Sequence, residues 1–342
     1  MLDQSILEPA MRRALELALR GPYFGVNPQV GAVILDEHGQ TISEGWHEGA
    51  GTRHAEVMAI DNLKQKLSYP FPVGLTAVVT LEPCNHTGRT GPCSQALIDA
   101  GISNVVFAAS DPGDASSNGS QTLRQAGIGV LAGFMAEESE AQGRIWLTAN
   151  RQQRPFVTLK WASSLDGRAA AQDGSSQWIT GPEAREDVHL RRSQADAILA
   201  GTGTVESDNA ELTARKPDGS YYEHQPLRVI LGERELDLQL RVFNDHAQTL
   251  HLHTRNIHGA LAELWARGIK HVFVEGGPEV ASQFERLNLV DEYLIYLAPV
   301  LLGGDRLSLR EIGVNSIEFA HRLEILEQRQ LGQDIFIRAR RA

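Results

Sequence analysis

Strand-like and helix-like segments alternate along the chain, and this alternation is the feature that most limits its fold. In the first 150 residues, short runs rich in valine, isoleucine and leucine are separated by segments with a helical spacing of apolar residues. This order is typical of a three-layer α/β domain, in which helices cover both faces of a sheet. The predicted elements are helices over 5–20, 54–67, 94–100 and 120–126, and strands over 30–35, 41–45, 75–81, 104–109 and 128–131.

A second series of strands and helices follows residue 150. Polar and basic residues gather between 144 and 154, and a chain of 342 residues exceeds the usual size of one domain. We therefore predict two α/β domains, residues 1–150 and 151–342. The predicted elements of the second are strands over 156–160, 197–200, 227–231, 271–275 and 292–297, a β-rich end over 336–339, and helices over 183–193, 260–267 and 279–287.

Charge and hydropathy exclude several classes of protein. The chain has 32 Lys and Arg against 43 Asp and Glu, for a net charge of -11. This balance argues against nucleic acid or an anionic membrane as partner, but it is compatible with a local basic pocket for a phosphorylated small molecule. The first residues lack the pattern of a secretion signal, and no apolar run approaches 18 residues. We expect a cytoplasmic protein without membrane contact.

The cysteine count is low and informative. The chain has two cysteines, Cys84 and Cys93, which are too few for a disulfide framework. In a reducing compartment, such a close pair favours a metal site or a redox pair, with two unrelated buried thiols as the plain alternative. His54-Ala-Glu56 opens a predicted helix, and Cys84 follows a proline at the end of a predicted strand. Histidine-x-glutamate followed by proline-cysteine and a second cysteine is the pattern of zinc nucleobase deaminases.

The chemistry of deamination explains this set of residues. Zinc held by one imidazole and two thiolates keeps a fourth position for water, which it makes nucleophilic at neutral pH. Glu56 is then free to carry a proton from that water to the ring nitrogen and to the leaving amine. Eight residues separate the cysteines here instead of two, and this segment can bulge outward while Cys93 reaches the metal from a helix N-terminus. We predict a catalytic zinc on His54, Cys84 and Cys93, since a structural zinc would not need Glu56.

Residues 83–93, which read Pro-Cys-Asn-His-Thr-Gly-Arg-Thr-Gly-Pro-Cys, closely resemble the deaminase half of the bifunctional deaminase–reductase family of riboflavin biosynthesis. Residues 27–31, Asn-Pro-Gln-Val-Gly, resemble it as well. The resemblance implies a cytidine-deaminase-like fold and a diaminopyrimidinone substrate that carries a ribosylamino 5′-phosphate. It places Asn27, His86 and Arg89 in the substrate pocket, although a solvated loop charge is an open alternative for Arg89. Val26 and Ser117 depart from the family pattern.

The second half has no complete Gly-x-Gly-x-x-Gly fingerprint, because residues 200–205 contain only its first two glycines. Instead, residues 272–278 form a predicted strand that runs into Gly-Gly-Pro, a junction that suits an anion. Residues 160–168, 176–180, 197–205, 275–278 and 298–303 resemble, in this order, the reductase half of the same family. That resemblance implies a dihydrofolate-reductase-like fold, NADPH as hydride donor, and reduction of the ribosyl side chain to ribityl.

Site residues of the reductase half follow from the resemblance by position. Arg192 and Arg215 suit the substrate phosphate, because a guanidinium fork matches phosphate oxygens. A core aromatic is the open alternative for Trp178. The residues implied to face substrate are Ser176, Arg192, Leu212, Arg215 and Glu275. The residues implied to face NADPH are Ala162, Trp178, Thr204, Asp208, Gly277, Pro278, Glu279, Val280, Ala281, Ser282 and Gln283.

We therefore predict a bifunctional enzyme with one zinc per chain, NADPH as cofactor, and a homo-oligomer, dimer or tetramer, as its assembly. Two other functions stay open. One is a nucleoside or RNA deaminase with an accessory, non-catalytic C-terminal domain, against which the acidic charge and the long segment between the cysteines speak. The other is a binding or regulatory protein whose reductase half has lost catalysis. Ala210 and Gly232-Glu233, which depart from the family pattern, keep that second possibility open.

Overall fold

A computed structural model describes residues 2–86, 91–113 and 116–342. The chain forms two compact units, and the boundary along the chain falls between Gln153 and Arg154. Within the described ranges, no helix combines the length and the apolar character needed to cross a membrane.

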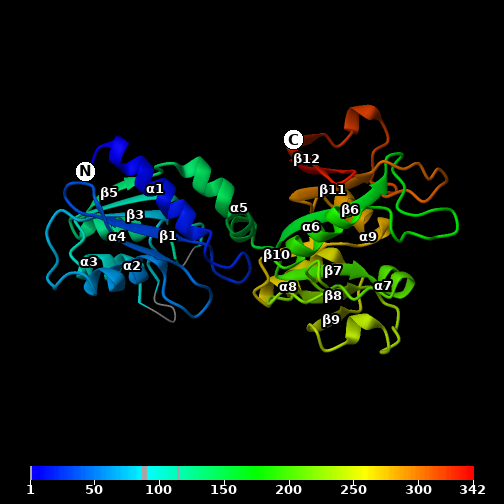
Figure 1. The fold of residues 1–342 in the computed structure, drawn as a ribbon, viewed down its shortest axis with the longest axis horizontal. Helices are drawn as coiled ribbons and strands as arrows, with labels where there is room; N and C mark the ends of the chain where they lie inside the picture. The colour runs from blue at the N-terminus through cyan, green and yellow to red at the C-terminus, as the bar shows by residue number, and fades with distance from the viewer. Residues whose placement is uncertain (1, 87–90, 114–115) are drawn as a thin grey trace. The chain divides into compact units, whose positions relative to one another are not determined.

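The first unit is built on a sheet with the strand order β2-β1-β3-β4-β5 (Figure 1). β1 runs antiparallel to β2 and β3, whereas β3, β4 and β5 run parallel. Valine, isoleucine and alanine fill β1, β3 and β4, and both faces of these strands are buried, as expected of a sheet with helices on each side. The strands are β1 (Gly31–Leu35), β2 (Thr41–Trp46), β3 (Thr76–Leu81), β4 (Asn104–Ala109) and β5 (Gly129–Ala132).

Helices pack on both faces of this sheet, which confirms the predicted three-layer architecture (Figure 1). Ala32 and Ile34 of β1 belong to the core beneath α2, α3 and α4, while Val33 and Leu35 belong to the core beneath α1. This alternation follows from the two-residue period of a strand. The helices are α1 (Gln4–Ala18), α2 (Ala55–Lys64), α3 (Cys93–Asp99), α4 (Gly119–Gln125) and α5 (Ala136–Gln152).

Helix α5 is missing from the sequence prediction, which places no element between residues 131 and 156. The buried residues of α5 are Ser139, Leu147 and Ala149, so the apolar spacing that indicates a helix is weak. A polar contact helps to hold α5, since the Ser139 hydroxyl donates to the Thr80 carbonyl at 2.6 Å. Contacts of this kind cannot be read from hydrophobic spacing.

The second unit is built on a sheet with the strand order β12-β13-β11-β6-β10-β7-β8-β9. Strands β11, β6, β10, β7, β8 and β9 run parallel, whereas β13 runs antiparallel to β11 and β12. The strands are β6 (Phe156–Ser164), β7 (Ala197–Gly201), β8 (Leu227–Leu231), β9 (Thr249–Leu252), β10 (His271–Val274), β11 (Glu292–Ala298), β12 (Leu323–Leu331) and β13 (Asp334–Arg341).

Helices also cover both faces of this second sheet. α8 and α9 share one hydrophobic core with the sheet, and α6 and α7 share the other. The helices are α6 (Pro182–Arg192), α7 (Thr202–Asp208), α8 (Ile257–Ala266) and α9 (Pro278–Arg286), with short 3-10 turns η1 (Arg241–Phe243) and η2 (Ile317–Phe319).

Three elements of the second unit are missing from the sequence prediction: α7, β9 and β12. α7 has seven residues and buries only Thr202 and Val205, which is too short for a helical period to appear. β9 has four residues. β12 is exposed along most of its length, as an edge strand can be, so it lacks the apolar alternation of a half-buried strand.

The parallel strands β10, β7 and β8 are neighbours and end at the same edge of the sheet. Their carboxyl ends lead into Glu275, Thr202 and Gly232 respectively. In open α/β sheets, ligands bind at this edge. Glu275 and Thr204, two residues predicted for the reductase site, therefore follow the ends of neighbouring strands although they lie far apart in the sequence.

Candidate active sites

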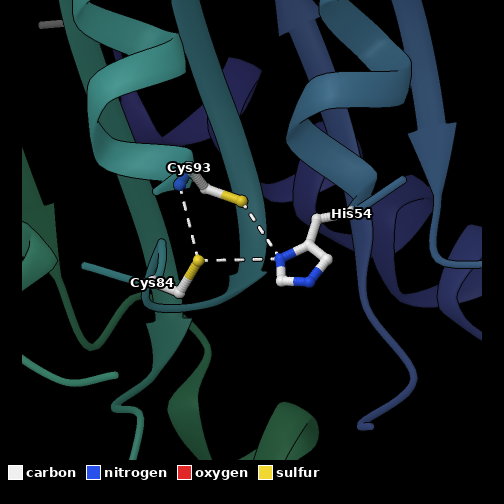
Figure 2. Close-up of side chains that lie close together, drawn as sticks. All are labelled: His54, Cys84 and Cys93. Atoms are coloured by element: carbon white, nitrogen blue, oxygen red, sulfur yellow. Dashed lines mark hydrogen bonds between the residues drawn. The ribbon is translucent and has the colours of Figure 1, made fainter. Parts of the chain in front are cut away.

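His54, Cys84 and Cys93 converge in the first unit from three different elements (Figure 2). His54 is the N-cap of α2, Cys93 is the first residue of α3, and Cys84 lies in the loop that follows β3. Nδ1 of His54 is 3.2 Å from Sγ of Cys93 and 3.6 Å from Sγ of Cys84. All three ligand atoms lie within 4.8 Å of one another.

This arrangement fits a zinc ion. Ligand atoms of a tetrahedral zinc site lie about 2.0–2.3 Å from the metal, and hence roughly 3.5 Å from one another. The contact between the two thiols lowers the pKa of Cys84 and raises that of Cys93, so without a metal the pair favours one thiolate, on Cys84. A bound zinc ion would favour loss of the second proton. One imidazole and two thiols that point at a common centre are a donor set that zinc prefers.

The Cys84 loop is held by two neighbouring segments. The backbone N–H of Ser94 donates to the Cys84 carbonyl at 3.1 Å, and the Ser94 hydroxyl donates to Oδ1 of Asn85 at 2.9 Å. The N–H of Asn85 donates in turn to the Ser116 carbonyl at 2.9 Å. The N–H of Cys93 donates to the Cys84 sulfur at 3.4 Å (Figure 2). These hydrogen bonds orient both sulfurs, and Ser94, Asn85 and Ser116, which take part in them, are not metal ligands themselves.

The start of α4 presses against the same loop. Oε1 of the buried Glu82 accepts the backbone N–H of Ser120 at 3.0 Å. A Cβ atom on Gly119 would lie 1.8 Å from the Pro83 carbonyl oxygen, so only glycine fits there. This contact fixes the peptide that leads directly into Cys84.

Glu56 lies in the first turn of α2, two residues after His54, and is 5% exposed. Burial, together with the charge of Cys84, raises the pKa of Glu56 to about 7. Glu56 is not one of the three converging ligands, so its carboxyl group is available for proton transfer beside them.

Asn27 is half-buried, and its Nδ2 lies 3.0 Å from Nε2 of His47. Nδ1 of His47 lies 3.0 Å from the carbonyl oxygen of Arg53, the residue before His54. If Nδ1 of His47 carries the proton and donates to this carbonyl, Nε2 accepts from Asn27 and the Asn27 carbonyl oxygen is left for another donor. His86 is exposed in the loop after Cys84, and Arg89 lies outside the described residues.

In the second unit, Glu275 lies between two cations. Its carboxylate accepts Nε and Nη2 of Arg192 at 2.6 and 3.0 Å, and Nζ of Lys160 at 3.2 Å. Burial would raise the pKa of Glu275, but the charges of Arg192 and Lys160 outweigh burial and hold the pKa at about 2. Two predicted substrate residues, Glu275 and Arg192, are thus direct partners.

Arg215 lies near this group but pairs with a different carboxylate. Its Nη1 donates to Oε2 of Glu211 at 2.7 Å. Between them, Leu212 is buried and has a left-handed backbone with φ of 54°. Nδ1 of His189 lies 3.2 Å from the backbone nitrogen of Arg215 and 3.1 Å from the Thr213 carbonyl oxygen.

The glycine turn between β10 and α9 packs tightly. A Cβ atom on Gly276 would lie 2.5 Å from Cβ of Val280, and the N–H of Gly277 donates to Oγ1 of Thr204 at 2.9 Å. Pro278 is the first residue of α9 and has no N–H. The N–H groups of the next two residues, Glu279 and Val280, have no acceptor within the helix. Such a turn suits the diphosphate of a dinucleotide, so these residues fit NADPH.

The other predicted cofactor contacts differ in exposure. Trp178 is 68% exposed with the Arg185 guanidinium 4.7 Å from its ring centre, so the core-aromatic alternative is wrong. The side chains of Ala281 and Ser282 are buried in the protein, so they are turned away from a ligand at the surface. Ser176, Ala162, Val280 and Gln283 are half-buried, and Asp208 and Glu279 are exposed.

Sequence reasoning missed three residues of this region: Lys160, His189 and Glu211. Lys160 ends the predicted strand over 156–160, and this was a usable signal, because a lysine is seldom buried at a strand without a partner. His189 gave no local signal, since its partners come from another segment. Glu211 lies four positions before Arg215, but its pairing with Arg241 depends on the fold.

Comparisons with known proteins cover both units. Residues 4–109 match the cytidine and deoxycytidylate deaminase zinc-binding region, and residues 155–337 match the RibD C-terminal domain. The riboflavin biosynthesis protein RibD of Mycobacterium tuberculosis is 43% identical over 311 residues, which cover 91% of this chain and 90% of that protein.

Solved structures agree with these matches. Acinetobacter baumannii RibD, form 1, is 34% identical with a TM-score of 0.89, and the alignment covers 99% of this chain and 100% of that one. A diaminohydroxyphosphoribosylaminopyrimidine deaminase/5-amino-6-(5-phosphoribosylamino)uracil reductase from Thermotoga maritima is 32% identical with a TM-score of 0.86, over 99% of each chain. The predicted fold class, a deaminase-like unit followed by a reductase-like unit, is confirmed.

Proposed function

The chain belongs to the RibD family of riboflavin biosynthesis proteins, and we propose that its two units catalyse successive steps on one substrate. The first unit hydrolytically deaminates 2,5-diamino-6-(5-phosphoribosylamino)pyrimidin-4-one with the help of zinc. The second unit reduces the ribosyl side chain of the product to ribityl with hydride from NADPH. The observation that carries this proposal is the convergence of His54, Cys84 and Cys93 beside the buried Glu56.

For the deaminase, we assign His54, Cys84 and Cys93 as zinc ligands and Glu56 as the proton carrier. Zinc supplies a water molecule that is nucleophilic at neutral pH. Glu56 would take a proton from that water and deliver it to the ring nitrogen. It would then carry the second proton, from the hydroxyl on the attacked carbon, to the amine that leaves as ammonia. Asn27, with its amide oriented by His47, supports binding of the pyrimidinone, and His86 and Arg89 extend the pocket.

For the reductase, we assign Arg192, Arg215, Glu275, Ser176 and Leu212 to the substrate. NADPH supplies the hydride, and the protein holds the sugar carbon C1′ against the nicotinamide. The turn at Gly277 and Pro278 supports binding of the cofactor diphosphate. The residues we assign with them to NADPH are Ala162, Trp178, Thr204, Asp208, Glu279, Val280, Ala281, Ser282 and Gln283, of which Ala281 and Ser282 would contribute backbone groups.

The substrate is a phosphorylated small molecule, and we expect neither nucleic acid nor membrane as a partner because the net charge is -11. We propose the cytoplasm as the compartment, since both cysteines are free thiols and zinc requires them reduced. We also propose a homo-oligomer, dimer or tetramer, by analogy with the family.

The test is one assay that follows ammonia and NADPH absorbance together after addition of the diaminopyrimidinone phosphate. Glu56→Gln should keep zinc but lower ammonia release by about a hundred- to ten-thousandfold, because the proton carrier is lost. When the deaminated product is supplied directly, this variant should still oxidise NADPH.

Glu37→Gln, which changes an exposed glutamate in the same unit, is the matched control. Normal ammonia release by Glu56→Gln would exclude the proton carrier, and failure of the parent to oxidise NADPH would exclude the reductase.

A further inference from the structure

The buried carboxylate of Glu211 joins two arginines. Its side chain is 3% exposed, and Oε2 accepts Nη1 of Arg215 at 2.7 Å as well as Nη2 of Arg241. Oε1 accepts the Tyr221 hydroxyl at 2.8 Å and Nδ2 of Asn244 at 3.0 Å. Both guanidinium groups therefore meet at one oxygen atom, while the other oxygen is held by neutral donors.

The charges in this cluster do not cancel. Arg215 paired with Glu211 alone would be a neutral pair, and a neutralised guanidinium attracts a phosphate weakly. Arg241 adds one positive charge that no second carboxylate of this cluster offsets. Burial would raise the pKa of Glu211, but its hydrogen bonds and the two arginines hold the pKa at about 2, so the carboxylate stays charged.

A second group with one excess positive charge lies next to this one. Arg192 and Lys160 share the single carboxylate of Glu275. His189 lies beside both groups, since its Nδ1 accepts the backbone N–H of Arg215 at 3.2 Å and the charges of Arg192 and Arg215 both act on its imidazole. The two groups together offer two excess positive charges, which match a phosphate monoester dianion.

Exposure favours approach of an anion to the cations of the Glu211 cluster. The side chains of Arg215 and Arg241 are 29% and 55% exposed, whereas that of Glu211 is 3% exposed. An anion that approaches from solvent meets guanidinium N–H groups before it meets the carboxylate. Charge-assisted bonds from two guanidinium groups are stronger and more directional than those from one.

We propose that Arg241 is a second contact for the 5′-phosphate of the reductase substrate, and that Glu211 is the positioning residue that holds Arg215 and Arg241 side by side. This inference rests on the proposed function, which assigns Arg215 to the same phosphate. The inference adds Arg241, which lies 26 positions after Arg215, at the start of η1.

Arg241→Gln tests the contact in the full-length enzyme. The KM for the deaminated, phosphorylated substrate should rise about tenfold with kcat unchanged, because a charge-assisted bond to a non-reacting group is lost. Inhibition of reduction by inorganic phosphate should weaken in parallel, and the salt dependence of KM should become shallower. Arg267→Gln is the matched control, since Arg267 is an arginine of similar exposure that pairs with Glu263 at 2.8 Å on α8.

Glu211→Gln separates positioning from charge. Glutamine keeps one acceptor oxygen but removes the negative charge. If Glu211 only opposed the phosphate, KM would fall; because it aligns two arginines, KM should rise while binding of NADPH, followed by its fluorescence, stays unchanged. A fall in KM for Glu211→Gln would overturn the positioning role.

Arg215→Gln distinguishes failure of this inference from failure of the proposed function. If Arg215→Gln raises KM and weakens phosphate inhibition but Arg241→Gln does neither, Arg241 is not a phosphate contact. If neither variant changes KM or phosphate inhibition, the assignment of this region to the substrate phosphate is itself wrong. Binding of NADPH, followed by its fluorescence, reports in every case that the second unit of the variant is folded.

Discussion

Each arginine assigned to the substrate phosphate is already held by a carboxylate: Arg192 by Glu275 and Arg215 by Glu211. A long arginine side chain that is held in place loses less conformational freedom when a ligand binds. Breaking such a buried pair by removing one partner costs about 3–5 kcal/mol, because the other charge is left unpaired. These pairs therefore order the site, and the removal of one partner alone should destabilise the second unit.

His189 yields a prediction at the residue scale. Burial, and then the charges of Arg192 and Arg215, lower its pKa to about 4, while Glu275 opposes them. The unfolded chain thus binds this proton first, near the ordinary pKa of 6.5, and the free energy of unfolding falls as pH drops from about 6.5 towards 4. Between pH 7.5 and 5.0 the loss from this group is about 1–2 kcal/mol, reduced for its partial exposure.

His189→Asn should remove that part of the pH dependence. Urea unfolding at pH 7.5 and 5.0, with hydrogen exchange of peptides from 154–342 as the readout for the second unit, measures it. The parent and the exposed control His258→Asn should both lose stability at pH 5.0 by more than His189→Asn does. An equal loss in all three proteins would contradict the lowered pKa.

At the scale of elements, the zinc site depends on how the start of α4 packs on the loop after β3. Glu82 accepts the N–H of Ser120, and Gly119 lies directly against the Pro83 carbonyl. Neither residue is a metal ligand, but both determine where Cys84 points. Groups of this kind commonly change metal affinity by about ten- to a hundredfold when they are altered.

Gly119→Ala should therefore weaken zinc binding by about ten- to a hundredfold, because the new Cβ would lie 1.8 Å from the Pro83 oxygen and the loop must move. Zinc retained after dialysis against graded chelator measures the effect, with ammonia release alongside. Gly143→Ala in α5 is the control, since its Cβ would meet only the flexible Leu147 side chain, at 3.3 Å. Equal zinc retention by Gly119→Ala and the parent would refute the role of this contact.

At the scale of the whole molecule, each unit has its own sheet, its own cores and its own candidate site. The candidate zinc ligands lie before Gln153, and the residues assigned to NADPH and to the ribosyl phosphate lie after it. The chemistry of one unit therefore requires no side chain assigned to the other.

Zinc removal should affect one activity only. Chelation should abolish ammonia release from the diaminopyrimidinone phosphate, while NADPH oxidation with the deaminated product stays unchanged, because hydride transfer uses no residue of the zinc cluster. Restored zinc should bring back ammonia release. Loss of both activities on chelation would show that the second unit depends on the metal.

The sequence by itself determined the alternation of strands and helices, the three-layer architecture of the first unit and the zinc-binding set with Glu56, and its resemblance to a known family supplied the order of the two units. These features depend on residue identity and on the pattern of residues along the chain, which can be recognised without the fold. Only the tertiary structure decided which charged side chains meet in the second unit. Lys160 reaches Glu275 across 115 positions because β6 and β10 are parallel neighbours, and Arg241 reaches Glu211 because η1 folds back on the segment before Leu212. The polar anchoring of α5 and the exposure of β12 likewise leave no hydrophobic period, so those elements became visible only in the fold.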